Sequence, residues 1–389
     1  MKKYSLASDS WGWGEKLAIL KVMASGRYTM GERVRQFEDE FAKKVGSSHA
    51  VMVNSGSSAN LVLVSALIQG PFDLRPGDEV IVPAVSWSTT YFPLTQMGLV
   101  PVFVDVDSNC NIDVFKVRKA ITSRTRAIFA VNLLGMPADL SILRDICTSN
   151  KMILIEDNCE SYGATLNGKY AGTYGLGGTF SFFFSHHLQT MEGGMIVTDN
   201  AVLADYMRSI RAHGWVRDLR TDVLYKKSGD PFEDSFKFVT EGYCVRPLEM
   251  SGAIGSVQLK KMNKFIEYRR DNAETFQEEF SDLQFGRQTE KSGMHSSWFG
   301  FAVILPKKHE GKRKKIIDAL KAENIETRPI VTGNFLNQPV INKITHKISG
   351  DLTNAEYLDK NGFFFGNDHR DLGDNIRRAR HVIGEALGE

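Results

Sequence analysis

The sequence predicts an α/β fold, with a mostly parallel central sheet covered by helices and a smaller C-terminal α+β domain. From about residue 47, strand-like segments alternate with segments that carry apolar residues at helical spacing. Two strand-like segments, 126–135 and 151–160, are nearly continuous apolar runs, as in strands buried on both faces of a parallel sheet. After about residue 235 this alternation ends. We therefore expect a large domain over 1–235 and a smaller domain over 236–389.

The individual elements follow from local patterns. Strands are expected in the segments 49–56, 78–86, 99–107, 126–135, 151–160, 179–185 and 193–199. Helices are expected over 57–68 and 141–150. Segment 251–280 is amphipathic and predicts one long helix or two. A strand at 298–305 and a basic helix from Lys312 complete the smaller domain.

Composition excludes several classes of protein. The 389 residues are 42% hydrophobic and 24% charged, with a net charge of +2, so nothing favours binding to nucleic acid or membrane. No apolar run approaches a membrane span, and no apolar run follows Lys2 and Lys3 as in a signal peptide, so a cytoplasmic protein is expected. The four cysteines, at 110, 147, 159 and 244, form no CxxC pair. They predict reduced thiols rather than a zinc site or an iron–sulfur cluster.

Two polar clusters follow predicted strands, at the edge of the sheet where ligands bind. In NSGSSAN (54–60), Gly56 permits a tight turn and Ser57 begins a helix whose free N–H groups would bind a phosphate. An ordinary helix start with Ser57 as the N-cap explains this cluster equally well. In SWSTTY (86–91), Trp87 is placed to stack on a flat ring, although a partly buried loop aromatic is the simpler interpretation.

Two further clusters carry titratable groups. In IEDNCES (155–161), Asp157 ends a buried strand and is placed to hold a pyridine nitrogen protonated. Glu160 follows three residues later and could reach the same ligand. The alternative is an acid that caps the next helix or forms an ion pair with an arginine. In SFFFSHHLQTMEGGM (181–195), two adjacent histidines precede a Glu-Gly-Gly turn. A histidine pair is usually structural, and no nearby spacing supplies the further ligands of a metal site.

Taken together and in this order, these clusters resemble the DegT/DnrJ/EryC1/StrS sugar aminotransferase family, which has the aspartate-aminotransferase-like fold (PLP fold type I). The resemblance extends over essentially the whole chain and includes GYCVRPLEMSGAIG (242–255), which is similar to the family's dimer-interface motif. It implies pyridoxal or pyridoxamine 5′-phosphate as cofactor, a nucleotide-linked keto sugar as substrate, and a homodimer with active sites at the subunit interface.

One departure from the family pattern decides the expected reaction. The family places a lysine five residues after the serine of its SFxxxK motif, and counting from Ser181 this position is His186. The histidine, the following His187 and the MEGG turn resemble the dehydratase branch. An imidazole cannot bond covalently to the cofactor aldehyde as lysine does, so non-covalent cofactor binding is implied. His186 would act as the general base.

The dehydratase resemblance implies a specific cycle. L-glutamate converts the cofactor to pyridoxamine phosphate, and the C3 hydroxyl of a 4-keto-6-deoxy sugar is then removed with release of ammonia. The expected substrate is GDP-4-keto-6-deoxy-D-mannose and the product GDP-4-keto-3,6-dideoxy-D-mannose, a step toward colitose in surface glycans such as O-antigen. A dehydratase for a CDP-linked sugar is an alternative, but that branch uses an iron–sulfur cluster with closely spaced cysteines, which this chain lacks.

Other roles carry over by matching motif. The expected phosphate ligands are Gly56, Ser57 and Ser181; Trp87 would stack on the cofactor ring, Asp157 would bind its nitrogen, and Glu160 would lie near its 3-hydroxyl. Candidate substrate contacts are His213, Arg217, Arg246 and Arg328, and for each arginine a salt bridge near the dimer interface is an equal alternative. Cys244 stands where the family usually has asparagine, and a thiol is a poor phosphate donor.

Two other functions compete with dehydration. A sugar aminotransferase of the same fold would need a lysine for the cofactor, and neither the histidine segment nor MEGGM offers one. A non-enzymatic ligand-binding relic would be expected to lose Asp157 or Trp87, and both are present.

Overall fold

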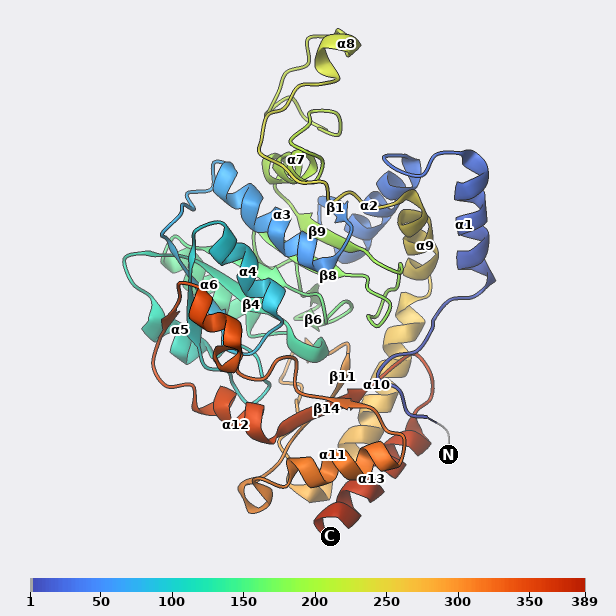
Figure 1. Ribbon diagram of the computed structural model, residues 1–389, viewed down its shortest axis with the longest axis vertical. Coiled ribbons are helices and arrows are strands. Elements are labelled where there is room, and N and C mark those ends of the chain that lie inside the picture. Colours follow the sequence, from blue (N-terminus) through green and yellow to red (C-terminus); the bar gives the residue numbers. More distant parts are fainter. Residues whose placement is uncertain (1–2, 389) are drawn as a thin grey trace.

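The computed structural model describes residues 3–388 and is built on an eight-stranded sheet with the order β1-β9-β8-β5-β4-β2-β3-β13 (Figure 1). The strands of this sheet are β1 (His49–Val53), β2 (Glu79–Pro83), β3 (Val100–Val104), β4 (Thr125–Val131), β5 (Ile153–Asp157), β8 (Gly177–Ser181), β9 (Gly194–Thr198) and β13 (Lys347–Ile348). Most neighbouring pairs are parallel, and β9 is antiparallel to both β1 and β8. The prediction of a mostly parallel α/β sheet is therefore confirmed.

The register places five strand ends at one edge of the sheet. β9 is antiparallel to both of its neighbours, so β1 and β8 run in the same direction as β5, β4 and β2. Their carboxyl ends therefore meet along one edge, where open parallel sheets bind ligands. Asp157 and Ser181 are the last residues of β5 and β8, so both lie at this edge.

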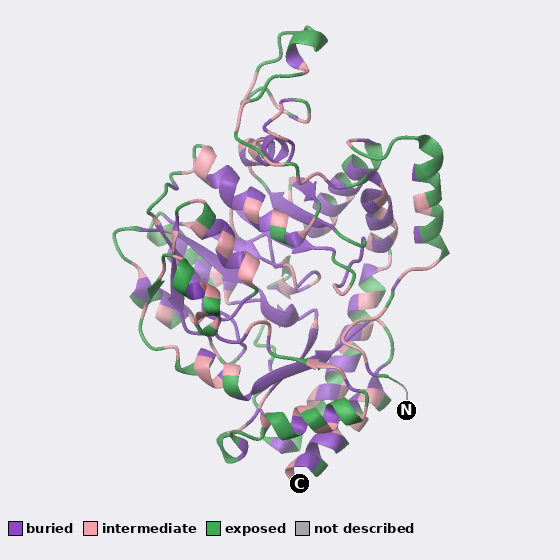
Figure 2. Cartoon of the chain, in the orientation of Figure 1, coloured by how far each residue is buried: buried purple, intermediate pink, exposed green. Residues whose placement is uncertain are grey.

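Helices cover both faces of the sheet. Successive side chains of a strand point to opposite faces, and in these strands both sets are apolar, so both faces must be buried. In β2, Val80 and Val82 pack into one buried cluster and Ile81 into another. The covering helices are α2 (Glu32–Val45), α3 (Gly56–Gln69), α4 (Ser88–Gln96), α5 (Val114–Ala120), α6 (Leu140–Ser149) and α7 (Ala201–Ile210). The strands are almost entirely buried between these layers (Figure 2).

The C-terminal part contains its own small antiparallel sheet, β11-β14-β12, with helices packed against it (Figure 1). The segment 251–280 forms two helices, α9 (Glu249–Leu259) and α10 (Met262–Glu279). The other elements here are β11 (Gly300–Ile304), β12 (Thr327–Arg328), β14 (Gly362–Gly366), α11 (Arg313–Ala322), α12 (Thr353–Asn361) and α13 (Gly373–Leu387). Strand β13 belongs to this half of the sequence but pairs with β3 of the large sheet. The domain boundary at 235/236 stays a prediction.

Short elements complete the described chain. They are α1 (Trp13–Ser25), α8 (Pro231–Asp234), β6 (Thr165–Leu166), β7 (Lys169–Tyr170), β10 (Met294–His295), η1 (Leu133–Gly135), η2 (Ser281–Leu283), η3 (Lys307–His309), η4 (Phe335–Asn337) and η5 (Pro339–Lys343). The segment that carries α8 projects away from the body of the molecule, and much of it is exposed (Figures 1 and 2). Within residues 3–388, no helix combines the length and apolarity needed to cross a membrane.

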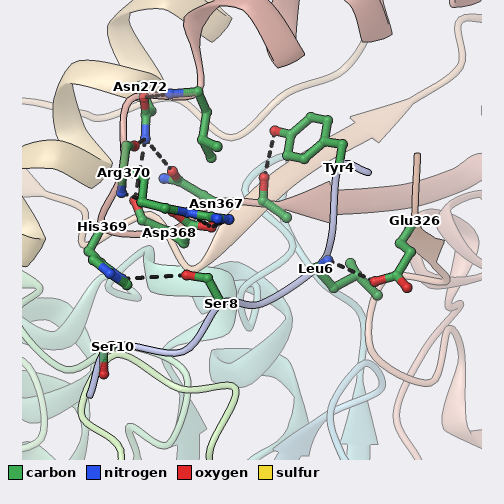
Figure 3. A network of polar contacts seen from close by, with 12 residues as sticks. Tyr4, Leu6, Ser8, Ser10, Asn272, Glu326, Asn367, Asp368, His369 and Arg370 are labelled. Atoms are coloured by element: carbon green, nitrogen blue, oxygen red, sulfur yellow. Dashed lines mark hydrogen bonds and ion pairs between the residues drawn. The ribbon is translucent and has the colours of Figure 1, made fainter. Parts of the chain in front are cut away.

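The N-terminal segment ties the C-terminal part to the large sheet (Figure 3). The Tyr4 hydroxyl donates to the Gly366 carbonyl at 2.7 Å, and the Leu6 amide donates to Glu326 at 3.0 Å. Further along, Ser8 and Ser10 both hydrogen-bond to the side chain of Gln189, which lies in the loop between β8 and β9. The segment therefore links the small sheet to the loop that contains the two histidines.

Asn272 fixes α10 to the loop after β14 (Figure 3). Its buried side-chain amide donates to Asn367, Asp368 and Arg370, at 3.1, 3.3 and 2.7 Å. Its carbonyl oxygen accepts from the Leu372 amide at 2.9 Å. All four contacts are to the loop 367–372, so this one side chain determines how the loop packs on the helix.

We expect Asn272→Ala to lower the free energy of unfolding by roughly 2–4 kcal/mol, because buried polar groups of the loop lose their partner. Urea unfolding followed by circular dichroism measures the loss. Glu274→Ala, an exposed change on the same helix, is the control and should have little effect. Equal stability of the two variants would show that the loop does not depend on Asn272.

Candidate active site

A cavity of about 300 Å³ opens at the carboxyl edge of the sheet. Its wall combines residues from the ends of β1, β2, β4, β5 and β8 with residues from the C-terminal part. Eight of the predicted site residues line it: Gly56, Ser57, Trp87, Asp157, Glu160, Ser181, His186 and Arg328. The topology thus brings together four sequence clusters that extend from residue 54 to residue 195.

The start of α3 forms one end of the cavity. The Ser55 hydroxyl accepts a hydrogen bond from the Ser58 amide at 3.1 Å, so Ser55 is the N-cap, and the prediction that Ser57 is the N-cap was wrong. Ser57 is instead exposed to the cavity and donates to Thr89 at 3.1 Å. The amides of Gly56 and Ser57 belong to the first turn, where N–H groups have no intrahelical partner, so they can receive a phosphate.

Gly56 is required by close packing at this end. A Cβ atom on Gly56 would lie 2.6 Å from the Ser181 Cβ and 2.9 Å from the Cys159 sulfur. Any side chain would therefore push the helix start away from β8. This contact brings the Ser181 hydroxyl to the same end of the cavity as the two amides.

Asp157 provides a fixed carboxylate at the centre of the edge. It is 6% exposed, and its Oδ2 accepts from Asn60 and Thr90, both at 2.8 Å, while its Oδ1 accepts from the Cys159 amide at 3.1 Å. Three donors from different elements hold the group in one orientation. A carboxylate so placed can pair with a protonated pyridine nitrogen.

Trp87 forms a side of the cavity. It is the residue before α4, and its side chain is 57% exposed, unlike the nearby apolar residues Ala84 and Val85. A flat aromatic ring can therefore lie against the indole without disturbing the core.

His186 and His187 lie in the loop between β8 and β9 but have different surroundings. His187 is fully buried, and its Nε2 is 3.0 Å from the Ser297 carbonyl. His186 is part-buried and faces the cavity, and its Nδ1 has no hydrogen-bond partner among residues 3–388. Burial lowers the pKa of His186 to about 4, so its imidazole is neutral at pH 7. Of the two, only His186 is placed to exchange a proton with a ligand.

Glu160 lies in the loop after β5 and lines the cavity. Its Oε2 accepts from the Leu134 amide at 3.1 Å. Burial raises its pKa to about 7, and the neighbouring Asp157 carboxylate adds to this rise. Near pH 7 the group can therefore either donate or accept a hydrogen bond.

These features fit a pyridoxal- or pyridoxamine-phosphate cofactor. The donors at the start of α3 suit a phosphate, the Asp157 carboxylate suits the ring nitrogen, and the exposed indole of Trp87 suits the ring face. The His186 imidazole lines the same cavity, so it can contact the ligand. Over residues 3–388, no cluster of three or more histidine, cysteine, aspartate or glutamate side chains is arranged to hold a metal ion.

Three predicted substrate residues do not line the cavity. His213, Arg217 and Arg246 surround Trp215 instead, near the base of the projecting segment. The Arg217 guanidinium carbon lies 4.2 Å from the centre of the Trp215 ring, and that of Arg246 lies 5.7 Å from it. Within one chain the two arginines lie over the Trp215 ring and His213 meets it edge-on. Their contact with substrate stays a prediction.

Sequence reasoning missed several residues of the cavity. Asn60 lines the cavity, and Thr90, outside the lining, helps to hold Asp157. They lie four residues after Gly56 and Ser86 of the wall, so helical spacing was an available signal. Phe299 lies next to both histidine rings, and no local pattern indicated this. Trp298, the residue before Phe299, belongs to the core and is 5% exposed.

The comparisons with known proteins agree with this geometry. Residues 13–366 match the model of the DegT/DnrJ/EryC1/StrS aminotransferase family. The chain is 51% identical to GDP-4-keto-6-deoxy-D-mannose 3-dehydratase of Yersinia pseudotuberculosis over 391 residues, which cover 98% of each protein.

Solved structures of similar proteins carry the expected ligands. A GDP-4-keto-6-deoxymannose-3-dehydratase with a trapped PLP–glutamate geminal diamine superposes with a TM-score of 0.94 at 51% identity, covering 98% of this chain and 100% of that one. A His-to-Asn variant of the enzyme ColD, with bound GDP-perosamine, superposes with a TM-score of 0.94 at 50% identity and the same coverage.

We expect Gly56→Ala to weaken binding of pyridoxal phosphate by at least about tenfold, because the new methyl group displaces the helix start from Ser181. Titration followed by cofactor absorbance measures the change. Ser58→Ala is the matched control, since Ser58 is on the same turn but does not line the cavity. Unchanged cofactor affinity in Gly56→Ala would place the phosphate elsewhere.

Proposed function

The chain belongs to the DegT/DnrJ/EryC1/StrS aminotransferase family, and within it we propose a pyridoxal-phosphate-dependent 3-dehydratase of a nucleotide-linked 4-keto-6-deoxy sugar. The substrate is GDP-4-keto-6-deoxy-D-mannose and the product is GDP-4-keto-3,6-dideoxy-D-mannose. L-glutamate supplies the amino group of the cofactor, and ammonia is released.

One observation carries the choice between dehydration and amino transfer. His186 occupies the cavity position at which the family's aminotransferases have lysine, in a cavity that otherwise keeps the cofactor-binding groups. Close similarity to a 3-dehydratase over 98% of the chain supports the same choice. The structures with a glutamate adduct and with GDP-perosamine support the two ligand classes.

The residues of the chain have distinct tasks in this reaction. When bound, pyridoxamine phosphate supplies an amine for the C4 ketone and a ring that accepts electrons. Asp157 keeps the ring nitrogen protonated, and Trp87 with the start of α3 holds the ring and phosphate without a covalent bond. The neutral imidazole of His186 takes a proton from the cofactor C4′ carbon and returns it to the C3 hydroxyl, which leaves as water.

Incubation with pyridoxal phosphate, L-glutamate and GDP-4-keto-6-deoxy-D-mannose tests the proposal. We expect the sugar to lose one oxygen, with 2-oxoglutarate and ammonia formed, and we expect His186→Asn to lower the rate by about 100-fold or more because the base is lost. Mass spectrometry and coupled assays measure the products.

The products also distinguish the alternatives. An amino sugar formed without ammonia would make the protein an aminotransferase. Turnover with a CDP-linked sugar but not the GDP-linked sugar would change the substrate assignment. Full activity in His186→Asn would contradict the assignment of the base.

We further propose that the enzyme is a homodimer whose active sites lie at the subunit interface. The segment around α8 projects from the body of one chain and exposes the large apolar side chains of Val223, Phe232, Phe236 and Phe238. Such a surface fits contact with a second copy. His213, Arg217 and Arg246, at the base of this segment, would then reach the partner's substrate. Free thiols at all four cysteines fit a cytoplasmic enzyme.

Mixing two inactive variants tests the shared site. His186→Asn and Arg217→Ala are each expected to be nearly inactive, but unfolding and refolding them together should restore roughly a quarter of wild-type activity, as random pairing around a twofold axis predicts. The activity assay measures recovery, and sedimentation gives the oligomeric state. A monomer, or two inactive variants that stay inactive when mixed, would contradict the interface assignment.

A further inference from the structure

Arg269 is a buried cation behind the histidine loop, and the reaction described above does not use it. It lies on α10 and is 4% exposed. No carboxylate of residues 3–388 lies within ion-pair distance of its guanidinium, although Asp368 is near enough to favour its charge. Burial lowers the pKa of Arg269 only to about 10, so it stays charged at pH 7. Removing a charge of this kind from water costs several kcal/mol of folding free energy, which the contacts of the guanidinium must offset.

The guanidinium is neutralised mainly by backbone carbonyls. Its Nη1 donates to the carbonyl oxygens of Trp298 and Phe299, both at 3.2 Å, and of Asn367 at 2.7 Å. Trp298 has a φ of +48°, a conformation that is unfavourable for a bulky side chain. Arg269 therefore stabilises a turn that the local sequence alone would not adopt.

This turn lies directly against the two histidines. The Phe299 ring is 5.2 Å from the His186 ring and 5.6 Å from the His187 ring. The Ser297 carbonyl, two residues earlier, holds the Nε2 of His187. The Phe299 ring of this turn thus packs against the imidazole of His186. Arg269 holds the turn through its hydrogen bonds to the Trp298 and Phe299 carbonyls.

Several charged groups face His186 from the elements around it. Asp157 ends β5, Glu160 follows it, Glu192 precedes β9, and Arg328 lies on β12, all in the same cavity wall. Burial lowers the pKa of His186 most, and a hydrogen bond with the Cys159 backbone opposes this effect. The positive charge of Arg269 lowers the pKa of His186 further and acts on His187 in the same direction. The guanidinium thus opposes a second positive charge on this loop.

We propose that Arg269 is a positioning residue for His186, which fixes the imidazole through the Trp298–Phe299 turn and places a permanent positive charge behind it. Arg269 does not touch the reacting atoms. It supplies two conditions that a histidine base needs: a defined ring orientation and a lone pair that stays free of its proton. The inference rests on the role of His186 in the proposed function, but its test is independent of turnover.

The test is a titration of His186 by NMR, with ¹⁵N-labelled histidine in the protein without substrate or cofactor. His186→Asn assigns the signal by its absence. In the wild type we expect His186 to stay neutral to about pH 5, well below an ordinary histidine. In Arg269→Gln we expect the titration midpoint to rise by about one pH unit, because the adjacent charge is lost.

Three further variants control the result. Arg270→Gln removes the neighbouring arginine, which donates to Ser296 and Gly163 instead, and should leave the midpoint unchanged. Arg269→Lys keeps the charge and should keep the midpoint near the wild-type value. If the Arg269→Gln protein does not fold, Phe299→Leu is measured in its place. This variant removes the aromatic ring that packs against His186 but leaves the Arg269 guanidinium in place. Its midpoint should stay low, while kcat falls because the ring is less well held.

Three outcomes would overturn the proposal. One is a wild-type midpoint at or above 6.5, the ordinary histidine pKa. Another is a folded Arg269→Gln protein with the wild-type midpoint. The third is a midpoint in Arg269→Lys or Phe299→Leu that rises to the ordinary value. The titration needs no turnover, so failure of this proposal and failure of the dehydratase assignment are separate results.

Discussion

The carboxylate of Asp157 is the constraint on which the site depends. It ends a buried strand and is held by an amide from α3, a hydroxyl from α4 and the backbone of the following loop. These donors come from helices that follow two different strands, so the carboxylate also fixes the two helix starts relative to each other. Removing the charge would release the cofactor nitrogen and also leave buried donors unpaired.

The start of α3 at Gly56 and the loop that contains His186 and His187 both contact the end of β8. Ser181 ends β8, touches the Gly56 position, and begins the loop that leads to His186. The N-terminal segment holds this loop on one side through Gln189, and the Trp298–Phe299 turn supports it on the other. The loop that carries His186 is therefore held from both sides, and it forms a fixed wall of the cavity that fits the cofactor.

The adjacent histidines differ in their surroundings, although they are neighbours in the same loop. His187 is buried with its Nε2 against the Ser297 carbonyl, whereas His186 lines the cavity. Burial lowers the pKa of both, but only His186 can reach a ligand. One residue of register in this loop therefore decides which imidazole lines the cavity.

Local patterns were sufficient for much of the fold and for most of the cavity. Alternating strand and helix signals gave the parallel sheet, and polar residues at strand ends gave Gly56, Trp87, Asp157 and Ser181, because parallel strands end at one edge. The helix cap was misplaced at Ser57 because adjacent serines are equivalent in sequence. Only the backbone shows that Ser55 has the extended conformation and the hydrogen bond of an N-cap.

What the sequence by itself determined is the chemistry available: a histidine where the family pattern has lysine, a carboxylate at a strand end, and a glycine at the start of a helix. Tertiary structure decided which groups meet. Phe299 and Arg269 are 113 and 83 residues from His186, and their contacts arise only because α10 and the 298–299 turn pack behind the loop. Likewise, His213, Arg217 and Arg246 lie away from the cavity of their own chain. Periodicity and composition describe neighbours along the chain, whereas these contacts depend on how separate layers pack.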